Sequence, residues 1–308
     1  FVMHGSGVRI SPAAPIPVLS DPTHFLHRRA AGPVDSAEPA VENGGVARRV
    51  GPWVRVAVNS RTLPQPCPDW ALFLDFDGCV VDIAPTPEAV VVPDCLPSLL
   101  VALREALGGA VAIVSGRPIE QIDGFLGSAV SAVAGLHGLE RRRADGGVVR
   151  PPLQRHDLRA VRALLAAFAA ERPGVLVEDK TYTVALHYRL SPALRDDCRD
   201  VVTAALEHAP RGWQVVEGKS VLEIRPCGPT KGTAIEAFMG EAPFLGRTPV
   251  FCGDDITDED GFRVVNARGG VSIRVGQGAA TQAAAQVDTV GELLDWLKRV
   301  AAATRASG

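Results

Sequence analysis

A short apolar run that ends in two aspartates constrains the fold of this chain more than any other feature. Residues 71–74, Ala-Leu-Phe-Leu, lead directly into Asp75-Phe76-Asp77-Gly78. An uninterrupted apolar run of this length is typical of a parallel strand that is buried on both faces of a sheet. In open α/β sheets, ligands bind beyond the carboxyl ends of such strands. The run therefore predicts a buried strand with Asp75 and Asp77 at a binding site.

Asp75 and Asp77 are separated by one residue, so their side chains are expected to leave the strand on the same side. Two carboxylates this close repel each other unless a cation or a shared proton compensates. The pair therefore indicates either a divalent-metal site or an acid/base couple with separated pKa values. A loop is the alternative interpretation, because Asp-Gly is also common in turns.

The composition is that of an ordinary globular protein. The 308 residues are 46% hydrophobic and 22% charged, which is enough for about two domains with a proper core. The formal net charge of -3 gives no basic field that would favour nucleic acid or an acidic membrane surface. No apolar run approaches the roughly 20 residues that cross a bilayer. The six cysteines show no C-x-x-C spacing, which favours reduced thiols in a cytoplasmic protein.

Residues 1–66 differ from the rest of the chain. They are rich in Pro, Gly, Ser and Arg, and they lack sustained hydrophobic periodicity. We expect this segment to be a disordered tail. Since the chain begins at Phe1 rather than Met, we also expect part of the segment not to be evolved sequence.

From Trp70 onward, short apolar runs alternate with amphipathic stretches, which predicts strand–helix crossover units and a parallel sheet. Leucines recur at helical spacing over residues 96–107, with Asp94 as the expected N-cap. A helix over residues 290–301 is expected to close the chain. The candidate buried strands are 70–74, 110–114, 131–134, 248–252 and 271–274.

The middle of the chain has a different pattern, in which strands alternate apolar and polar residues as in a sheet with one exposed face. The expected elements are a helix over 153–170, strands over 175–177 and 183–187, a helix over about 192–207, and strands over 213–217 and 221–225. We therefore expect residues 140–225 to form a small α+β domain. It is inserted into a core made of residues 67–139 and 226–304.

Three further groups of polar residues fall where strands end or helices begin. Ser115-Gly116-Arg117 follows a strand and offers a hydroxyl and free backbone N–H groups to a phosphate. Lys231 opens a helix and can neutralise a phosphate or crowded carboxylates. Residues 253–260 carry so many carboxylates that a cation is expected, and oxygen ligands without His or Cys favour Mg²⁺. The alternatives are a Ser-Gly turn and a surface lysine near a helix cap.

In this order, the groups resemble the four motifs of the haloacid dehalogenase superfamily of phosphotransferases. Further motifs resemble the trehalose-6-phosphate phosphatase family, and the resemblance covers roughly residues 70–300. These motifs are Ser115-Gly116-Arg117-Pro118, Gly135-Leu136-His137-Gly138, Glu217-Gly218-Lys219, Glu223-Ile224-Arg225-Pro226, Lys231-Gly232-Thr233-Ala234 and Gly253-Asp254-Asp255-Ile256-Thr257-Asp258-Glu259. The resemblance implies an α/β fold: a Rossmann-like core with a parallel sheet, plus a smaller inserted α+β cap. One departure is Cys79-Val80, where the family usually has Thr-Leu; it affects the expected efficiency rather than the reaction type.

The resemblance also implies a mechanism. Asp75 is expected to attack phosphorus and form an aspartyl-phosphate, and Asp77 to act as general acid and then base. Mg²⁺ is expected to be the cofactor. Its implied ligands are Asp75, the backbone carbonyl of Asp77 and Asp254, with Asp258 in support. Ser115 and Lys231 are implied to bind phosphoryl oxygens.

The same resemblance places sugar recognition mainly on the inserted cap. The residues implied to bind substrate are Arg117, His137, Gly138, Glu140, Glu178, Lys180, Glu217 and Lys219. Paired carboxylates and lysines suit a polyhydroxylated ligand, which offers many donors and acceptors. An ordinary exposed charge is the alternative for each cap residue, and His137 has the alternative of a strand-end histidine.

The function that the resemblance implies is Mg²⁺-dependent hydrolysis of trehalose 6-phosphate in the cytoplasm. The expected partner is a small-molecule sugar phosphate, with trehalose-6-phosphate synthase as a pathway neighbour and no nucleic acid or membrane. One alternative is a related phosphatase acting on another sugar phosphate, such as sucrose phosphate or mannosyl-phosphoglycerate. Another is a catalytically inactive sugar-phosphate-binding relative. The presence of both Asp75 and Asp77 favours an enzyme, because binding alone does not require an acid/base at the second position.

Overall fold

The computed structural model describes residues 62–150, 158–277 and 280–305. The predicted tail falls mostly on residues 1–61, which lie outside the described residues. Residues 62–66 contact the folded part of the chain. Leu63 packs against an apolar cluster of the core, and Trp296 Nε1 donates a hydrogen bond to the Pro64 carbonyl at 3.1 Å. The core therefore begins before residue 67, the boundary expected from the sequence.

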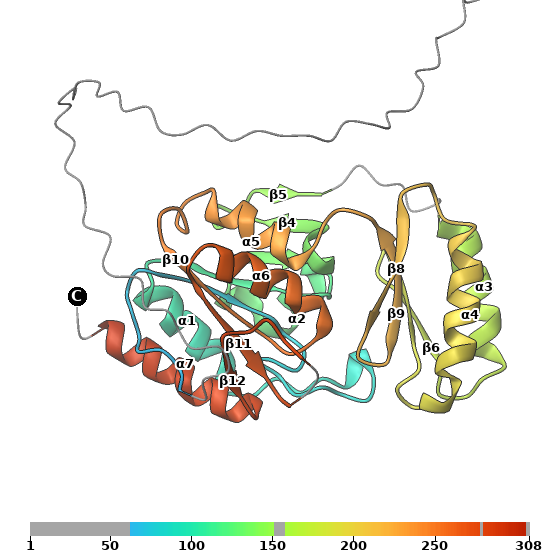
Figure 1. The fold of residues 1–308 in the computed structure, drawn as a ribbon, viewed down its shortest axis with the longest axis horizontal. Helices are drawn as coiled ribbons and strands as arrows, with labels where there is room; N and C mark the ends of the chain where they lie inside the picture. Colours follow the sequence, from blue (N-terminus) through green and yellow to red (C-terminus); the bar gives the residue numbers. More distant parts are fainter. Residues whose placement is uncertain (1–61, 151–157, 278–279, 306–308) are drawn as a thin grey trace, which may run out of the picture. The chain divides into compact units, whose positions relative to one another are not determined.

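The larger of two sheets has eight strands in the order β12-β11-β10-β1-β2-β3-β4-β5 (Figure 1). All pairs from β12 to β3 are parallel, and β4 and β5 are antiparallel. The strand bounds are β1 Trp70–Leu74, β2 Val111–Val114, β3 Ala132–Gly135, β4 Glu140–Arg142, β5 Val148–Val149, β10 Thr248–Gly253, β11 Val271–Val275 and β12 Ala285–Val287. This arrangement confirms the predicted α/β fold, and β1 lies between β2 and β10.

Helices cover both faces of this sheet (Figure 1). Leu72 and Leu74 of β1 belong to the apolar cluster that contains α1, α2 and α7, whereas Ala71 and Phe73 belong to the cluster that contains α5 and α6. The helix bounds are α1 Leu96–Ala106, α2 Ile119–Leu126, α5 Lys231–Met239, α6 Glu259–Ala267 and α7 Val290–Arg305. Because alternate residues of β1 point to opposite faces, its uninterrupted apolar run is explained by burial on both sides.

Two predictions about local structure were wrong or incomplete. Asp94 is not the N-cap of α1; Cys95 takes that position with a helical backbone, and no side chain caps the helix. A turn from Pro93 to Leu96, closed by a 2.8 Å backbone hydrogen bond, already precedes the helix. The strand β12 was missed, because its three residues carry too little periodicity to be recognised.

The second sheet is antiparallel, with four strands in the order β6-β7-β9-β8. Its elements follow the predicted helix–strand–strand–helix–strand–strand order, and the start of the first predicted helix falls on residues 151–157, outside the described residues. The bounds are α3 Arg159–Ala170, β6 Leu176–Asp179, β7 Val184–His187, α4 Arg195–Leu206, β8 Trp213–Gly218 and β9 Val221–Pro226. Residues of α3 and α4 share an apolar cluster with one face of this sheet. The other face carries Glu178 and Glu223, both in register with Ala185.

The hydrogen bonding of β4 and β5 bears on where the inserted domain begins. These strands extend the larger sheet from β3, so residues 140–149 belong to that sheet rather than to the insertion. We propose that the smaller domain begins after β5 and ends with β9. On this proposal, the smaller domain begins later than the start at residue 140 that was expected from the sequence.

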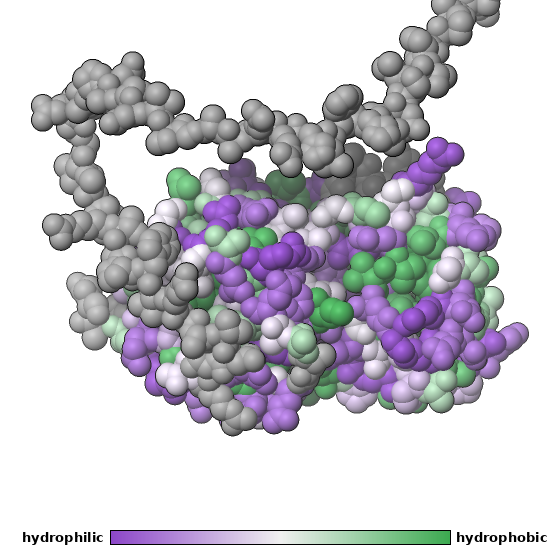
Figure 2. Space-filling view, in the orientation of Figure 1, coloured by the Kyte–Doolittle hydropathy of each residue, from purple (hydrophilic) through white to green (hydrophobic). Residues whose placement is uncertain are grey.

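The surface of the described residues carries few exposed large apolar side chains, and hydrophilic residues are spread over the face seen in Figure 2. Among these residues, no helix has both the length and the apolar character needed to cross a membrane.

The close approach of α5 to α6 gives a test of the packing. A Cβ at Gly232 of α5 would lie 2.7 Å from the Asp260 carbonyl oxygen, whereas a Cβ at Gly124 of α2 would meet nothing within 4 Å. Gly232→Ala is therefore expected to lower the free energy of unfolding by about 1–3 kcal/mol. Gly124→Ala, the matched control, is expected to raise it by about 0.5–1 kcal/mol through helix propensity. Urea unfolding measures both, and equal effects would contradict the close helix contact.

Candidate active site

Three buried carboxylates meet at the carboxyl ends of β1 and β10. Asp75 follows β1, Asp254 follows β10, and Asp258 ends a short 3₁₀ turn before α6. One oxygen from each lies within 4.8 Å of the others. Burial and the nearby Asp258 carboxylate raise the pKa of Asp75 well above its ordinary value, and the same causes raise the pKa of Asp254 to about 6. The cluster therefore has more negative charge than its surroundings compensate, which favours a bound cation.

Lys231, the first residue of α5, lies between two of these carboxylates. Its Nζ is 2.9 Å from Asp75 Oδ1 and 2.7 Å from Asp258 Oδ1. Burial opposes the charge of Lys231, but the two carboxylates outweigh burial and raise its pKa above the ordinary value. Asp258 is itself fixed, because its Oδ2 accepts hydrogen bonds from the backbone N–H groups of Asp254 and Asp255, each at 2.9 Å. The orientation of Asp75 therefore depends on a chain of contacts that ends in the backbone.

Gly78 explains why a glycine follows the two aspartates. Its φ of 77° lies in the left-handed region, and a Cβ there would overlap the carboxylate of Asp254. The loop after β1 can approach the carboxylate cluster only because residue 78 has no side chain.

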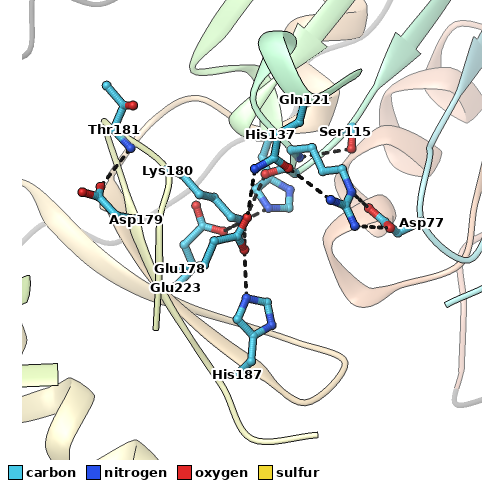
Figure 3. A network of polar contacts seen from close by, with 12 residues as sticks. Asp77, Ser115, Gln121, His137, Glu178, Asp179, Lys180, Thr181, His187 and Glu223 are labelled. Carbon is cyan, nitrogen blue, oxygen red and sulfur yellow. Dashed lines mark hydrogen bonds and ion pairs between the residues drawn. The ribbon is translucent and has the colours of Figure 1, made fainter. Parts of the chain in front are cut away.

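Asp77 is held by a guanidinium rather than by the carboxylate cluster (Figure 3). Arg117 Nε donates to Asp77 Oδ2 at 2.7 Å, and Arg117 Nη2 donates to Asp77 Oδ1 at 2.9 Å. The guanidinium also lies over the rings of Phe76 and Phe125, at 5.8 and 5.2 Å from their centroids. Ser115 Oγ accepts a hydrogen bond from the backbone N–H of Arg117 at 3.1 Å. The side chain of Asp77 thus has a defined orientation before any substrate binds.

A polar network from the small sheet faces this group (Figure 3). Lys180 Nζ donates to Glu223 Oε2 at 3.2 Å and to the Gly116 carbonyl of the core at 3.1 Å. His187 Nε2 lies 2.9 Å from Glu178 Oε2. Burial opposes ionisation of Glu178, but His187 and Lys180 lower its pKa to about 2. Lys180 and His137 likewise hold the pKa of Glu223 well below its usual range, against the effect of burial. Both carboxylates are therefore charged hydrogen-bond acceptors at neutral pH.

His137 lies between the core and this network. Its Nε2 is 3.4 Å from Glu223 Oε2, and its backbone has φ 55° and ψ 34°. Burial lowers the pKa of His137 to about 4, although Glu223 partly opposes the shift. A Cβ at Gly116 would lie 2.6 Å from His137 Nε2, so the glycine makes room for the ring.

One cavity is lined both by residues of the carboxylate cluster of the core and by the polar residues of the small sheet. The predicted site residues that line it are Asp75, Asp77, Arg117, His137, Glu178, Lys180, Lys219, Lys231 and Asp254. The predicted site residues that do not line it are Ser115, Gly138, Glu140, Glu217 and Asp258. Lining residues that were not predicted from the sequence are His187, Arg189 and the segment 83–87. Glu223 was part of a recognised motif without a role, and the periodicity of β7, which places His187 and Ala185 on one face, could have indicated His187.

The position of Glu217 argues against its predicted contact with the sugar. Glu217 is in register with Leu222, which packs on the helix-covered face of the small sheet. Its carboxylate accepts from Arg195 Nη2 at 2.6 Å and from Arg199 Nη2 at 2.8 Å, both on α4. Lys219, two residues later, follows the end of β8 and reaches the other side, where its ammonium pairs with Asp254.

Glu140 and Gly138 have contacts that account for them structurally. Glu140 Oε1 accepts from the backbone N–H of Ile119 at 2.7 Å, at the start of α2, and Oε2 accepts from Arg150 Nε at 3.1 Å. A Cβ at Gly138 would lie 2.7 Å from the Thr230 carbonyl oxygen, next to α5. Neither residue reaches the cavity, so their predicted roles in substrate binding are not supported.

The lowered pKa of His137 predicts how stability depends on pH. A histidine with a pKa of about 4 when folded and about 6.5 when unfolded contributes stability above pH 6.5 that is lost as the pH falls through 4. His137→Asn removes the titrating group, and asparagine tolerates the left-handed backbone. Compared with wild type, the variant is expected to lose less unfolding free energy between pH 6.5 and 4, by up to roughly 3 kcal/mol. Urea unfolding at several pH values measures this difference.

The control for this experiment is His208→Asn, because His208 is exposed at the surface. It is expected to follow the wild-type pH dependence. Parallel curves for wild type and His137→Asn would show that His137 titrates normally in the folded protein.

Comparison with known proteins agrees with this geometry. The trehalose-phosphatase family model matches residues 73–290. A probable trehalose-phosphate phosphatase of Sinorhizobium fredii is 46% identical over 208 residues, which cover 68% of this chain and 78% of that protein. The trehalose-6-phosphate phosphatase of Escherichia coli is 40% identical over 240 residues, covering 78% of this chain and 90% of that protein. The solved C-terminal domain of C. albicans trehalose-6-phosphate phosphatase, 20% identical, aligns with a TM-score of 0.66 over 76% of this chain and 92% of that chain, which supports the fold. The chain therefore belongs to the trehalose-phosphatase family, whose members are phosphoric monoester hydrolases.

Proposed function

We propose that this protein hydrolyses trehalose 6-phosphate to trehalose and phosphate through an aspartyl-phosphate on Asp75, with Mg²⁺ as cofactor. The observation that carries the proposal is the buried cluster of Asp75, Asp254 and Asp258 around Lys231, in a cavity whose other wall is polar and belongs to the inserted domain. We further propose that the enzyme acts in the cytoplasm, after a synthase that supplies the sugar phosphate.

The donor set fits Mg²⁺. It consists of carboxylate oxygens without His or Cys, which is the ligand chemistry of a hard divalent cation. Burial is the largest cause of the raised pKa values of Asp75 and Asp254, and repulsion from Asp258 raises both further despite the nearby lysines. A bound cation would offset both effects. Asp75, Asp254 and the backbone carbonyl of Asp77 would hold the ion, with Asp258 in support. When bound, it supplies positive charge that screens the incoming phosphate from the anionic Asp75.

The first chemical step requires an oriented carboxylate and a proton donor. Lys231 holds Asp75 through Oδ1 and leaves Oδ2 to attack phosphorus. As the bond from phosphorus to the sugar oxygen breaks, Asp77 gives its proton to that oxygen. The ammonium of Lys231, held beside Asp75, would stabilise the charge that builds up on the phosphoryl group in the transition state. Buried Ser115 accepts a hydrogen bond from the backbone N–H of Arg117 and would order the turn beside the bound phosphate.

In the second step, Asp77 takes a proton from a water molecule that attacks the aspartyl-phosphate. Phosphate leaves, and Asp75 returns to its carboxylate form.

The two sides of the cavity suit the two parts of the substrate. The small sheet contributes charged groups that match sugar hydroxyls: Glu178, Lys180, His187, Arg189, Lys219 and Glu223. The core contributes the apolar segment 83–87, against which the C–H faces of a sugar ring can pack. Buried polar groups that are left unpaired reject a wrong sugar, so this wall supports a dedicated substrate rather than a broad range of phosphate esters.

The nucleophile is tested by Asp75→Asn, which keeps the shape of the side chain but removes its charge. Turnover of trehalose 6-phosphate, measured as phosphate release, is expected to fall by at least about a thousandfold, because the neutral amide cannot attack phosphorus to form the phosphoenzyme. Asp69→Asn, an exposed position before the opposite end of β1, is the control and is expected to leave turnover unchanged. A rate above about a tenth of wild type in Asp75→Asn would identify a different nucleophile. Equal wild-type rates with a panel of other sugar phosphates would contradict the proposed substrate.

The metal is tested by two measurements. Excess EDTA is expected to abolish phosphate release, and added Mg²⁺ to restore it. Independently of activity, Mg²⁺ at 100 times its dissociation constant is expected to raise the unfolding free energy by about 2.7 kcal/mol, because only the folded chain assembles the cluster. The melting temperature of Asp254→Asn should respond much less to Mg²⁺. Full turnover in EDTA would exclude the metal from the mechanism.

A further inference from the structure

Arg117, which orients Asp77, has a second polar contact that the mechanism above does not use. Arg117 Nη1 donates a hydrogen bond to Gln121 Oε1 at 3.1 Å, one turn along in α2. With two bonds to Asp77 and two phenylalanine rings under its plane, the guanidinium is held on three sides. A planar fork held in this way transmits its own position to the carboxylate that it binds.

Gln121 continues this chain of contacts to the inserted domain. Its Nε2 lies 3.4 Å from Glu178 Oε1, and Glu178 Oε2 is bonded to His187. The contact therefore joins α2 of the core to β6 of the small sheet, and Glu178 and His187 both line the cavity (Figure 3).

The charges along the chain determine how the Gln121 amide is oriented. Its oxygen must face the guanidinium, and its NH₂ group must face the ionised Glu178, because the reverse orientation would place donor against donor and acceptor against acceptor. In the chain of contacts from Asp77 to His187, each hydrogen-bond donor therefore faces an acceptor. Lys180 bonds to Glu223 and to the Gly116 carbonyl, and its Nζ lies 3.8 Å from the same Glu178 oxygen that contacts His187, so it leaves Oε1 of Glu178 to Gln121.

We propose that Gln121 is a positioning residue that couples the sugar-binding carboxylate Glu178 to the acid/base Asp77 through Arg117. When the small sheet is in place over the core, Glu178 fixes the Gln121 amide, the amide fixes Arg117, and Arg117 fixes Asp77. This inference rests on the proposed function, because it assigns proton transfer to Asp77 and sugar recognition to Glu178. It makes the placement of the small sheet over the core a condition for correct placement of the proton donor.

The need for a correctly placed Asp77 differs between two kinds of substrate. A sugar alkoxide is a poor leaving group and needs a proton from Asp77 as its bond to phosphorus breaks. The p-nitrophenolate ion is a good leaving group. Formation of the phosphoenzyme from p-nitrophenyl phosphate therefore needs neither that proton nor the polar side chains of the small sheet. The ratio kcat/KM reports only the steps up to that first transfer, which isolates the role of the proton donor.

The experiment compares Gln121→Ala and Gln121→Glu with wild type on both substrates. Gln121→Ala removes both contacts, whereas Gln121→Glu keeps an oxygen for Arg117 and places a like charge against Glu178. Both variants are expected to lower kcat/KM for trehalose 6-phosphate about tenfold and to keep kcat/KM for p-nitrophenyl phosphate within about twofold. Glu120→Ala, at an exposed neighbouring position on α2, is the control and is expected to match wild type on both. Melting temperatures confirm that each variant is folded.

Each contrary outcome overturns the proposal in a distinct way. If Gln121→Glu equals wild type on the sugar phosphate, the contact with Glu178 has no role. If Gln121→Ala lowers kcat/KM equally for both substrates, the residue only supports the phosphate site. Wild type that hydrolyses p-nitrophenyl phosphate but no sugar phosphate would instead refute the proposed function, and this result is seen before any variant is measured.

Discussion

The contact on which the site depends is the one between Lys231 and its two carboxylates. Three buried aspartates at the end of a sheet repel one another, and the desolvation of each would be too costly without a cation at contact distance. Lys231 supplies that charge from the first turn of α5, and Asp258 anchors it through two backbone N–H groups. In the proposed mechanism, the remaining charge of the cluster would favour a divalent cation. Burial, which is unfavourable for each group alone, would then serve both the orientation of Asp75 and the binding of the metal.

The two sheets divide the work according to their architecture. In the parallel sheet, the ends of β1, β2 and β10 lie side by side, so loops far apart in the sequence converge on one point. In the antiparallel sheet, alternate residues face either the helices or the cavity, so a short stretch of strand supplies several polar side chains to one surface. The first arrangement suits a fixed set of reacting groups, and the second suits many contacts with a polyhydroxylated ligand.

The fold, and the convergence of Asp75 and Asp254 at one end of the sheet, could be predicted from the sequence because both leave local patterns. The buried strand before Asp75 is an uninterrupted apolar run, and Asp254 follows a second one directly. The side chains that the small sheet contributes to the cavity are harder to predict, because an alternating strand does not reveal which face is covered by helices and which is open. Glu217 and Glu223 look equivalent in the sequence, yet Glu217 lies on the face with α4 and Glu223 lies on the face with the cavity. The positions of Glu140 and Gly138 depend on contacts with α2 and α5 that no local pattern shows.

The arrangement around Asp77 shows how recognition and chemistry can be linked without a large movement of the reacting groups. Asp75 is fixed by contacts within the core alone, so its position does not depend on the small sheet. Asp77, with a side chain that is 35% exposed, is held by Arg117 instead, and Arg117 leads through Gln121 to Glu178 of the small sheet. In the proposed mechanism, the core alone holds the nucleophile, whereas placement of the proton donor depends on the small sheet. Such an enzyme would accept a phosphate ester in general but favour the one that the small sheet recognises. Specificity would then arise at the step in which the leaving group is protonated, because this is the step at which the two sheets must act together.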